Sequence, residues 1–141
     1  YPPGDCSFDN KTGIIRRKLI KFLLPNRFAS FGRYDAAKYY VRYEAHIRKY
    51  LGENAKGKGV TCLVGWDNTS RYGKDGRVLI NSSAALVSSH MRNVVDYSNK
   101  VGSEFLFIKA FNEWAEGNVI EPCNKFDNAL FDEVSKILNQ C

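Results

Sequence analysis

The segment FLFIKAFNEWAEG, residues 105–117, joins an apolar run to a short acidic motif. The run at residues 105–110 is rich in aromatic and branched side chains, which favour strands. Two carboxylates and an indole follow within four residues, on Glu113, Trp114 and Glu116. We therefore predict a strand over residues 105–110 with a polar loop at its carboxyl end.

A second segment has the same layout. Residues 60–64 read VTCLV and are apolar on both faces, as expected of a parallel strand that helices cover. The polar string GWDNTSR follows directly, at residues 65–71. The sequence thus contains two predicted strands, and each one ends in a polar loop.

The rest of the chain has helical periodicity. We predict helices over residues 34–51, from Ser82 or Ser83 to about residue 98, and over residues 124–140, with a short basic helix at 14–24 that Pro25 would end. The inward positions expected are Ala36, Tyr40, Tyr43, Ile47 and Tyr50; Leu86, Val87, Met91, Val94, Val95 and Ser98; and Leu130, Val134 and Ile137 with the companion pair Phe131 and Leu138. Helices alternating with strands indicate parallel βαβ units, and hence an α/β fold.

Composition and charge narrow the class of protein. The 141 residues suit one globular domain, residues 1–141, with a net charge of +6. Residues 1–58 carry 13 Lys and Arg against 5 Asp and Glu, but these charges lie between helical apolar positions, as on a solvated face. No segment has the roughly 20 apolar residues of a membrane span, and no signal peptide is visible. We expect a cytoplasmic protein with no nucleic-acid partner and no membrane span.

The cysteines and histidines do not suggest a reactive site. Cys6, Cys62, Cys123 and Cys141 lack the spacing of a zinc site, so we expect reduced, mostly buried thiols and no metal. Ser88, Ser89 and His90 are adjacent on a predicted helix and point in different directions, so they do not form a nucleophile and its base. His46, on a helix flank, is expected to be structural or solvated.

The two polar loops carry the candidate chemistry. In parallel α/β folds the loops after the strands converge at one edge of the sheet, so Trp66, Asp67 and Asn68 should meet Asn112, Glu113, Trp114 and Glu116. Indoles stack on sugar rings, and glycosidic cleavage uses two carboxyl groups, for which Glu113 and Glu116 are the candidates. The alternative is structural: a glutamate caps the next segment, Trp114 fills the core and Asn112 makes a turn.

Strand alternation adds an expectation for Lys109. Phe107, Lys109, Phe111 and Glu113 share one side if the extended backbone continues. If that side faces away from the helices, Lys109 lies below the site and a nearby carboxylate is its expected partner. With the opposite parity, Lys109 would meet a covering helix.

The two polar strings together carry a family resemblance. GWDNTSR at residues 65–71, followed by FIKAFNEWAEG at 107–117 and Ile120-Glu121-Pro122, resembles the WbsX-type glycosyltransferase domain, which is similar to the glycoside hydrolase family 99 endo-α-mannosidases. Residues 55–138 carry the motifs, and residues 1–54 resemble the preceding part of the same domain. The sequence departs from the usual pattern at Ser70, Phe111 and Cys123, and Ala115 follows the WbsX form rather than the hydrolase form.

The resemblance implies a (β/α)8 barrel that acts on glycans in surface-polysaccharide pathways. By carry-over, Glu113 would assist the substrate's 2-hydroxyl in attacking the anomeric carbon, and Glu116 would act as acid and then as base. It implies substrate-binding roles for Trp66, Asp67, Asn68, Arg71, Asn112, Trp114 and Glu121. It implies no cofactor; a transferase would also bind a nucleotide-sugar donor.

Length qualifies this expectation. Eight strand–helix units take roughly 250 residues, so the 141 residues suit only the C-terminal portion of a (β/α)8 TIM-type barrel. We expect the isolated chain to be inactive and to expose strand edges and apolar faces. The alternative function is a noncatalytic carbohydrate-binding or assembly fragment.

Overall fold

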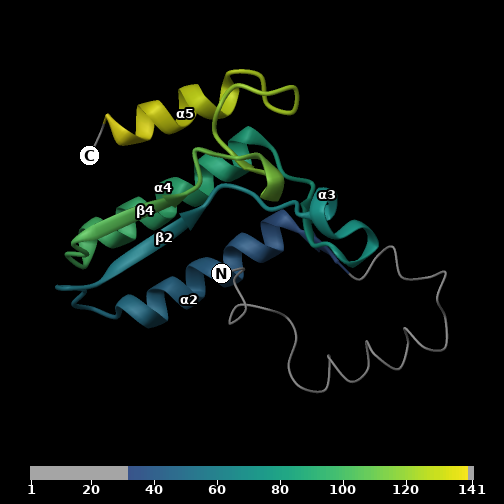
Figure 1. The fold of residues 1–141 in the computed structure, drawn as a ribbon. Helices are drawn as coiled ribbons and strands as arrows, with labels where there is room; N and C mark the ends of the chain where they lie inside the picture. The colour runs from purple at the N-terminus through teal and green to yellow at the C-terminus, as the bar shows by residue number, and fades with distance from the viewer. Residues whose placement is uncertain (1–31, 140–141) are drawn as a thin grey trace, which may run out of the picture.

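The computed structural model describes residues 32–139. Three long helices, α2 (Ala36–Leu51), α4 (Ala84–Lys100) and α5 (Ala129–Leu138), alternate with strands (Figure 1). The strands are β1 (Arg33–Asp35), β2 (Gly59–Leu63), β3 (Val78–Ile80), β4 (Phe105–Lys109), β5 (Asn112–Glu113) and β6 (Asn118–Val119). Short helical turns are α3 (Thr69–Tyr72), η2 (Gly73–Asp75) and η3 (Trp114–Glu116). The helix predicted over residues 14–24 lies outside the described residues.

The two predicted strands pair as expected. β2 and β4 are parallel, with Thr61 opposite Phe107 and Leu63 opposite Lys109. A second parallel pair, β1 with β3, was not predicted, because each strand has only three residues and shows no periodicity. A backbone hydrogen bond of 2.8 Å from Leu79 to the Trp66 carbonyl ties β3 to the segment after β2. The fold is therefore mixed α/β with short parallel strand pairs.

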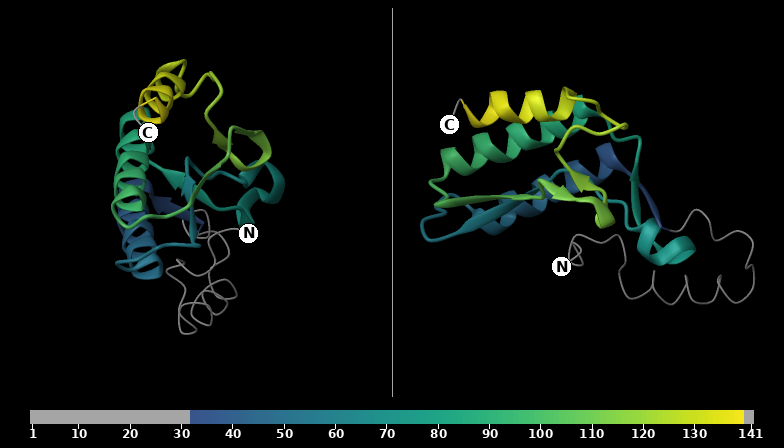
Figure 2. Two further views of the ribbon diagram at one scale, coloured as in Figure 1. Left: turned by 90° about the vertical axis from the view of Figure 1, so that its left-hand side faces the viewer. Right: turned by 45° about the horizontal axis from the view of Figure 1, so that its top comes forward.

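The three long helices lie side by side on one face of β2 and β4 (Figure 2). On β4 the residues that point away from this helical layer include Phe105 and Phe107, which are 56% and 58% exposed. Lys109 shares their side of the strand, because side chains two residues apart point the same way. Of the two parities considered from sequence, the structure has the one that turns Lys109 away from the helices.

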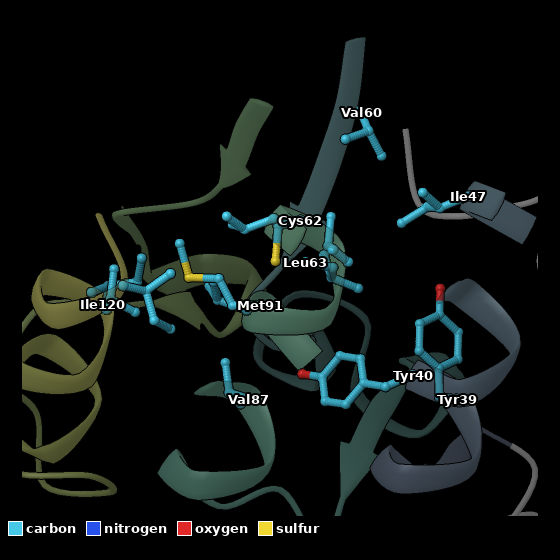
Figure 3. Close-up of a cluster of buried hydrophobic side chains, with 14 of the residues drawn as sticks. Tyr39, Tyr40, Ile47, Val60, Cys62, Leu63, Val87, Met91 and Ile120 are labelled. Atoms are coloured by element: carbon cyan, nitrogen blue, oxygen red, sulfur yellow. The ribbon is translucent and has the colours of Figure 1, made fainter. Parts of the chain in front are cut away.

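The core fills the space between the helices and the strands (Figure 3). Of the inward positions predicted on α2, Ala36, Tyr40 and Ile47 are buried, and the half-buried Tyr43 donates a hydrogen bond of 2.7 Å to the Thr61 carbonyl. Tyr50 was wrongly predicted: it is 54% exposed, because Leu51 takes the inward position and the Tyr50 ring lies beside the Lys58 ammonium instead.

The predicted inner faces of the other two helices are largely confirmed. Ser83 caps α4 by accepting a hydrogen bond from the Leu86 amide. The α4 positions are buried except for the half-buried Leu86, and Leu130, Val134 and Ile137 are buried on α5. Phe131 and Leu138 were wrongly included, since both are exposed. The reason is that α5 packs mainly on α4 and so buries only a narrow stripe. Its start at Ala129 is later than predicted, because residues 123–127 form a tight turn.

Candidate functional site

The loops after β2 and β4 meet, as the sequence predicted. The Asp67 amide donates a hydrogen bond of 2.7 Å to the Glu116 carbonyl. Gly117 permits this approach: it has a φ of +61°, and a Cβ there would lie 2.8 Å from the Asp67 Cβ. Gly65 is also constrained, since its Cβ would lie 2.9 Å from the Gly117 carbonyl oxygen. Both motifs therefore depend on glycine for their contact.

The Glu116 carboxylate lies between two cations. Its Oε2 is 3.2 Å from the Lys109 Nζ, and its Oε1 is 3.6 Å from an Arg71 guanidinium nitrogen. The Lys109 ammonium also lies 5.6 Å from the centre of the Trp66 ring. We call Trp66, Arg71, Lys109 and Glu116 the ion-pair cluster. The expectation that Lys109 has a carboxylate partner is confirmed.

The two indoles differ in exposure. Trp66 is buried, with 6% of its surface accessible, and it forms part of the core beneath Lys109. Trp114 is 56% exposed, and its Nε1 donates a hydrogen bond of 2.9 Å to Glu121. That bond fixes the ring edge and leaves much of the ring open. Of the two indoles, therefore, only Trp114 offers a surface on which a ligand can stack.

The other predicted residues divide between loop structure and open positions. Asp67 Oδ1 accepts hydrogen bonds from the Thr69 amide and hydroxyl, while Asn68 is buried and its Oδ1 accepts from the Arg77 amide at 2.6 Å. Asn112 is exposed at the start of β5, and Glu113 is half-buried beside it. Within residues 32–139 the structure gives the Glu113 carboxylate no hydrogen bond or ion pair.

A cleft of about 430 Å³ opens beside Trp114. We call it the Trp114 cleft; its lining residues are Asp67, Trp114, Gly117, Val119, Pro122, Cys123, Asn124, Lys125 and Phe126. Its volume lies in the range of small-molecule sites. The glutamate pair does not line it. Of these lining residues, the sequence predicted Asp67 and Trp114 as site residues but missed residues 124–126. A lysine and a phenylalanine shortly after Glu121-Pro122 were the feature that could have indicated them.

Two buried groups of the core, Cys62 and His90, have shifted pKa values. Burial raises the pKa of the Cys62 thiol to about 12, which suits an inert core residue. Burial also lowers the pKa of His90, although the hydrogen bond of its Nδ1 with Glu44 opposes the shift. Ser88 bonds to Glu133 instead of His90, in agreement with the sequence reasoning.

Two further features concern metals and membranes. Residues 32–139 contain no group of three His, Cys, Asp or Glu side chains placed to hold a metal ion. Over the same range, none of the helices has the length and apolar character needed to cross a bilayer.

The fold and the loops define a mixed α/β domain with carboxylates and an exposed indole at the ends of parallel strands. Residues 7–134 match the protein family described as Glycosyltransferase WbsX. The chain therefore belongs to the WbsX glycosyltransferase family.

Similarity to individual proteins covers a smaller part of the chain. Two proteins, each named "Uncharacterized protein WxcX", come from strains B100 and ATCC 33913 of Xanthomonas campestris pv. campestris. Each is 30% identical over 79 residues, which is 54% of this chain and 11% of the relative. The chain thus aligns with only a small part of those proteins. No solved structure matches it significantly.

Proposed function

We propose that this chain contributes the carboxylate pair of a glycosyl-transferring or glycoside-hydrolysing site in surface-polysaccharide metabolism. Glu113 and Glu116 are the two carboxyl groups, and the cytoplasm is the proposed location. The observation that carries the proposal is the position of Glu116, fixed between Lys109 and Arg71 where the loops after β2 and β4 meet.

Glycosidic chemistry requires two carboxyl groups that do different work, one at the leaving oxygen and one at the attacking group. The two glutamates have different surroundings. Glu116 is paired with two cations, while the described chain gives Glu113 none. Such a difference in neighbours is the usual way in which two equal carboxyl groups acquire separate roles.

The surroundings of the pair suit a carbohydrate. The exposed ring of Trp114 can stack on the C–H face of a pyranose, and its bond to Glu121 restrains the ring orientation. Asp67 Oδ2 can accept a hydrogen bond from a sugar hydroxyl, because the bonds from Thr69 use the other oxygen. β5 and β6 pair antiparallel and form a hairpin that carries both glutamates. A ligand at these positions would lie next to that hairpin.

We further propose that β2 and β4 are neighbouring strands of a (β/α)8 barrel. The helical layer on one face and the exposed Phe105 and Phe107 on the other are the arrangement expected of a barrel wall. The lumen and the remaining strands would then come from sequence beyond residues 32–139. This proposal predicts little activity for the isolated chain.

A second candidate is a noncatalytic carbohydrate-binding or assembly module. It is favoured by the fact that both carboxylate oxygens of Glu116 already have cationic partners, which is also what a structural ion pair would show. The exposed indole would then serve binding alone.

The experiment compares Glu113→Gln and Glu116→Gln with Glu53→Gln, an exposed glutamate outside the loops. The full-length protein that contains this chain is incubated with nucleotide sugars and with α-mannosides. Nucleotide release without free reducing sugar indicates transfer, and free reducing sugar indicates hydrolysis. Turnover should fall at least a hundredfold in both site variants and stay unchanged in the control. Unchanged turnover in the site variants would refute the catalytic pair, and retained glycan binding with no turnover in any form would favour the second candidate.

A further inference from the structure

The Trp114 cleft has a feature that neutral sugar binding does not require. Lys125 lines the cleft, and its ammonium lies 4.9 Å from the centre of the Phe126 ring. Within residues 32–139 the structure gives Lys125 no carboxylate partner, whereas Lys109 and Arg71 both pair with Glu116. The cleft therefore contains one ammonium, on Lys125, with no direct ion pair in the described chain, and one carboxylate, on Asp67.

The walls of the cleft have complementary chemistry. One wall offers the Asp67 carboxylate, whose Oδ2 is not used by the hydrogen bonds from Thr69. Another offers the Trp114 ring and the apolar side chains of Val119 and Phe126. An acceptor, an apolar platform and a separate cation match a ring that carries hydroxyls, C–H faces and one negative group.

We propose that the Trp114 cleft binds a sugar residue bearing a negatively charged group, with its ring on Trp114, a hydroxyl on Asp67 and the anion on Lys125. This rests on the proposed glycan function and adds the substrate class. The negative group is either the carboxylate of an acidic sugar in the polysaccharide or the phosphate of an activated donor. Both sources present the same chemistry to Lys125.

Two reporters in the chain make the proposal testable. The sequence has two tryptophans, so Trp66→Phe leaves Trp114 as the sole indole, and its fluorescence should change when a ring stacks on it. Cys123 lines the cleft, while Cys62 is buried in the core. In a chain with Cys6→Ser and Cys141→Ser, the alkylation rate of Cys123 therefore reports whether a ligand occupies the cleft.

The experiment titrates four ligands into the chain: a neutral hexose oligosaccharide, a matched hexuronate oligosaccharide, a hexose 1-phosphate and a nucleotide-sugar. At least one anionic ligand should bind about fivefold more tightly than the neutral oligosaccharide and slow alkylation of Cys123. Lys125→Gln should lower the affinity for the anionic ligand to that for the neutral one, while Lys49→Gln, the same charge change on the exposed surface of α2, should keep the preference. A preference for the hexuronate identifies a polysaccharide residue, and a preference for the phosphates identifies a donor.

Two results would overturn the proposal and leave glycan binding intact. One is equal affinity for neutral and anionic sugars with no effect of Lys125→Gln. The other is anionic binding that leaves Cys123 alkylation unchanged, which would place the ligand elsewhere. If no sugar of either kind binds, the proposed function fails as well.

Discussion

The contact between the two motif loops can be tested through Gly117. Replacing it by alanine should destabilise the fold in two ways. An L-residue at a φ of +61° costs about 1–2 kcal/mol. In addition, the new methyl group would lie 2.8 Å from the Asp67 Cβ and 2.9 Å from the Asp67 amide nitrogen, and overpacking of this kind costs roughly 1–3 kcal/mol.

Gly102 supplies the matched control. Its φ is +69°, and a Cβ there would have nothing within 4 Å. Gly102→Ala therefore carries the conformational penalty without the steric contact. Both substitutions also reduce the entropy of the unfolded chain by a similar amount, so that effect cancels in the comparison. The difference between the two variants isolates the approach of the loops, at about 1–3 kcal/mol.

Urea unfolding followed by circular dichroism measures this difference. With a urea dependence of about 1–3 kcal/mol per molar for a small protein, the unfolding midpoint of Gly117→Ala should lie about 1 M below that of Gly102→Ala. Equal midpoints would show that Asp67 does not approach Gly117, and the candidate site would then lose the junction on which it depends.

Three further predictions concern other parts of the described chain. Burial holds the pKa of His90 below its ordinary 6.5, so as the pH falls below about 6.5 the unfolded chain binds a proton that the folded chain does not. The free energy of unfolding measured in urea melts should therefore decrease from pH 7.5 to pH 5.5. His90→Gln should reduce this decrease and exposed His46→Gln should not; equal pH slopes in all three proteins would contradict the assignment. Replacing Phe107, which is exposed on β4, by threonine should reduce self-association measured by light scattering, while Val41→Thr on α2 should have no effect. Unchanged self-association of the Phe107 variant would mean that this face of β4 does not mediate it. Lys109→Met should lower the free energy of unfolding in urea by about 1 kcal/mol, and Lys136→Met, in a more exposed ion pair, should lower it by about 0.3 kcal/mol. Equal decreases would count against a special role for the ion-pair cluster.

Local pattern was sufficient to predict β2, β4 and most of the inner faces of α2, α4 and α5. These elements repeat an apolar period over several turns or form a continuous apolar run. Tyr50 and Phe131 show the limit of this reasoning. A periodic apolar stripe predicts which side of a helix faces the core, but it does not predict how far the packed neighbouring elements extend over that side. β1 and β3 have three residues each, which is too short for a period, and they are held by pairing with distant segments.

The site was predictable in its location and less so in its detail. Parallel strand ends brought Asp67 and Glu116 together, as general α/β geometry requires. The sequence does not distinguish Trp66 from Trp114, because the burial of an indole depends on the layer behind it. Residues 124–126 were also assigned to the start of a predicted helix, so the Trp114 cleft that they line together with Gly117 and Val119 was not predicted.

Glu116 is constrained through both its backbone and its side chain, and this separates it from Glu113. Its carbonyl accepts hydrogen bonds from the Asp67 amide and from the buried Asn118 side chain, and its carboxylate pairs with Lys109 and Arg71. A carboxylate with so little freedom is already oriented before a substrate arrives, which reduces the reorganisation that a reaction would need. Glu113 is the last residue of β5, just before the η3 turn that contains Glu116, and it has no such partners in the described chain, so its orientation can follow the ligand. Loss of the fixed group should therefore lower kcat, whereas loss of the adaptable group should also alter KM.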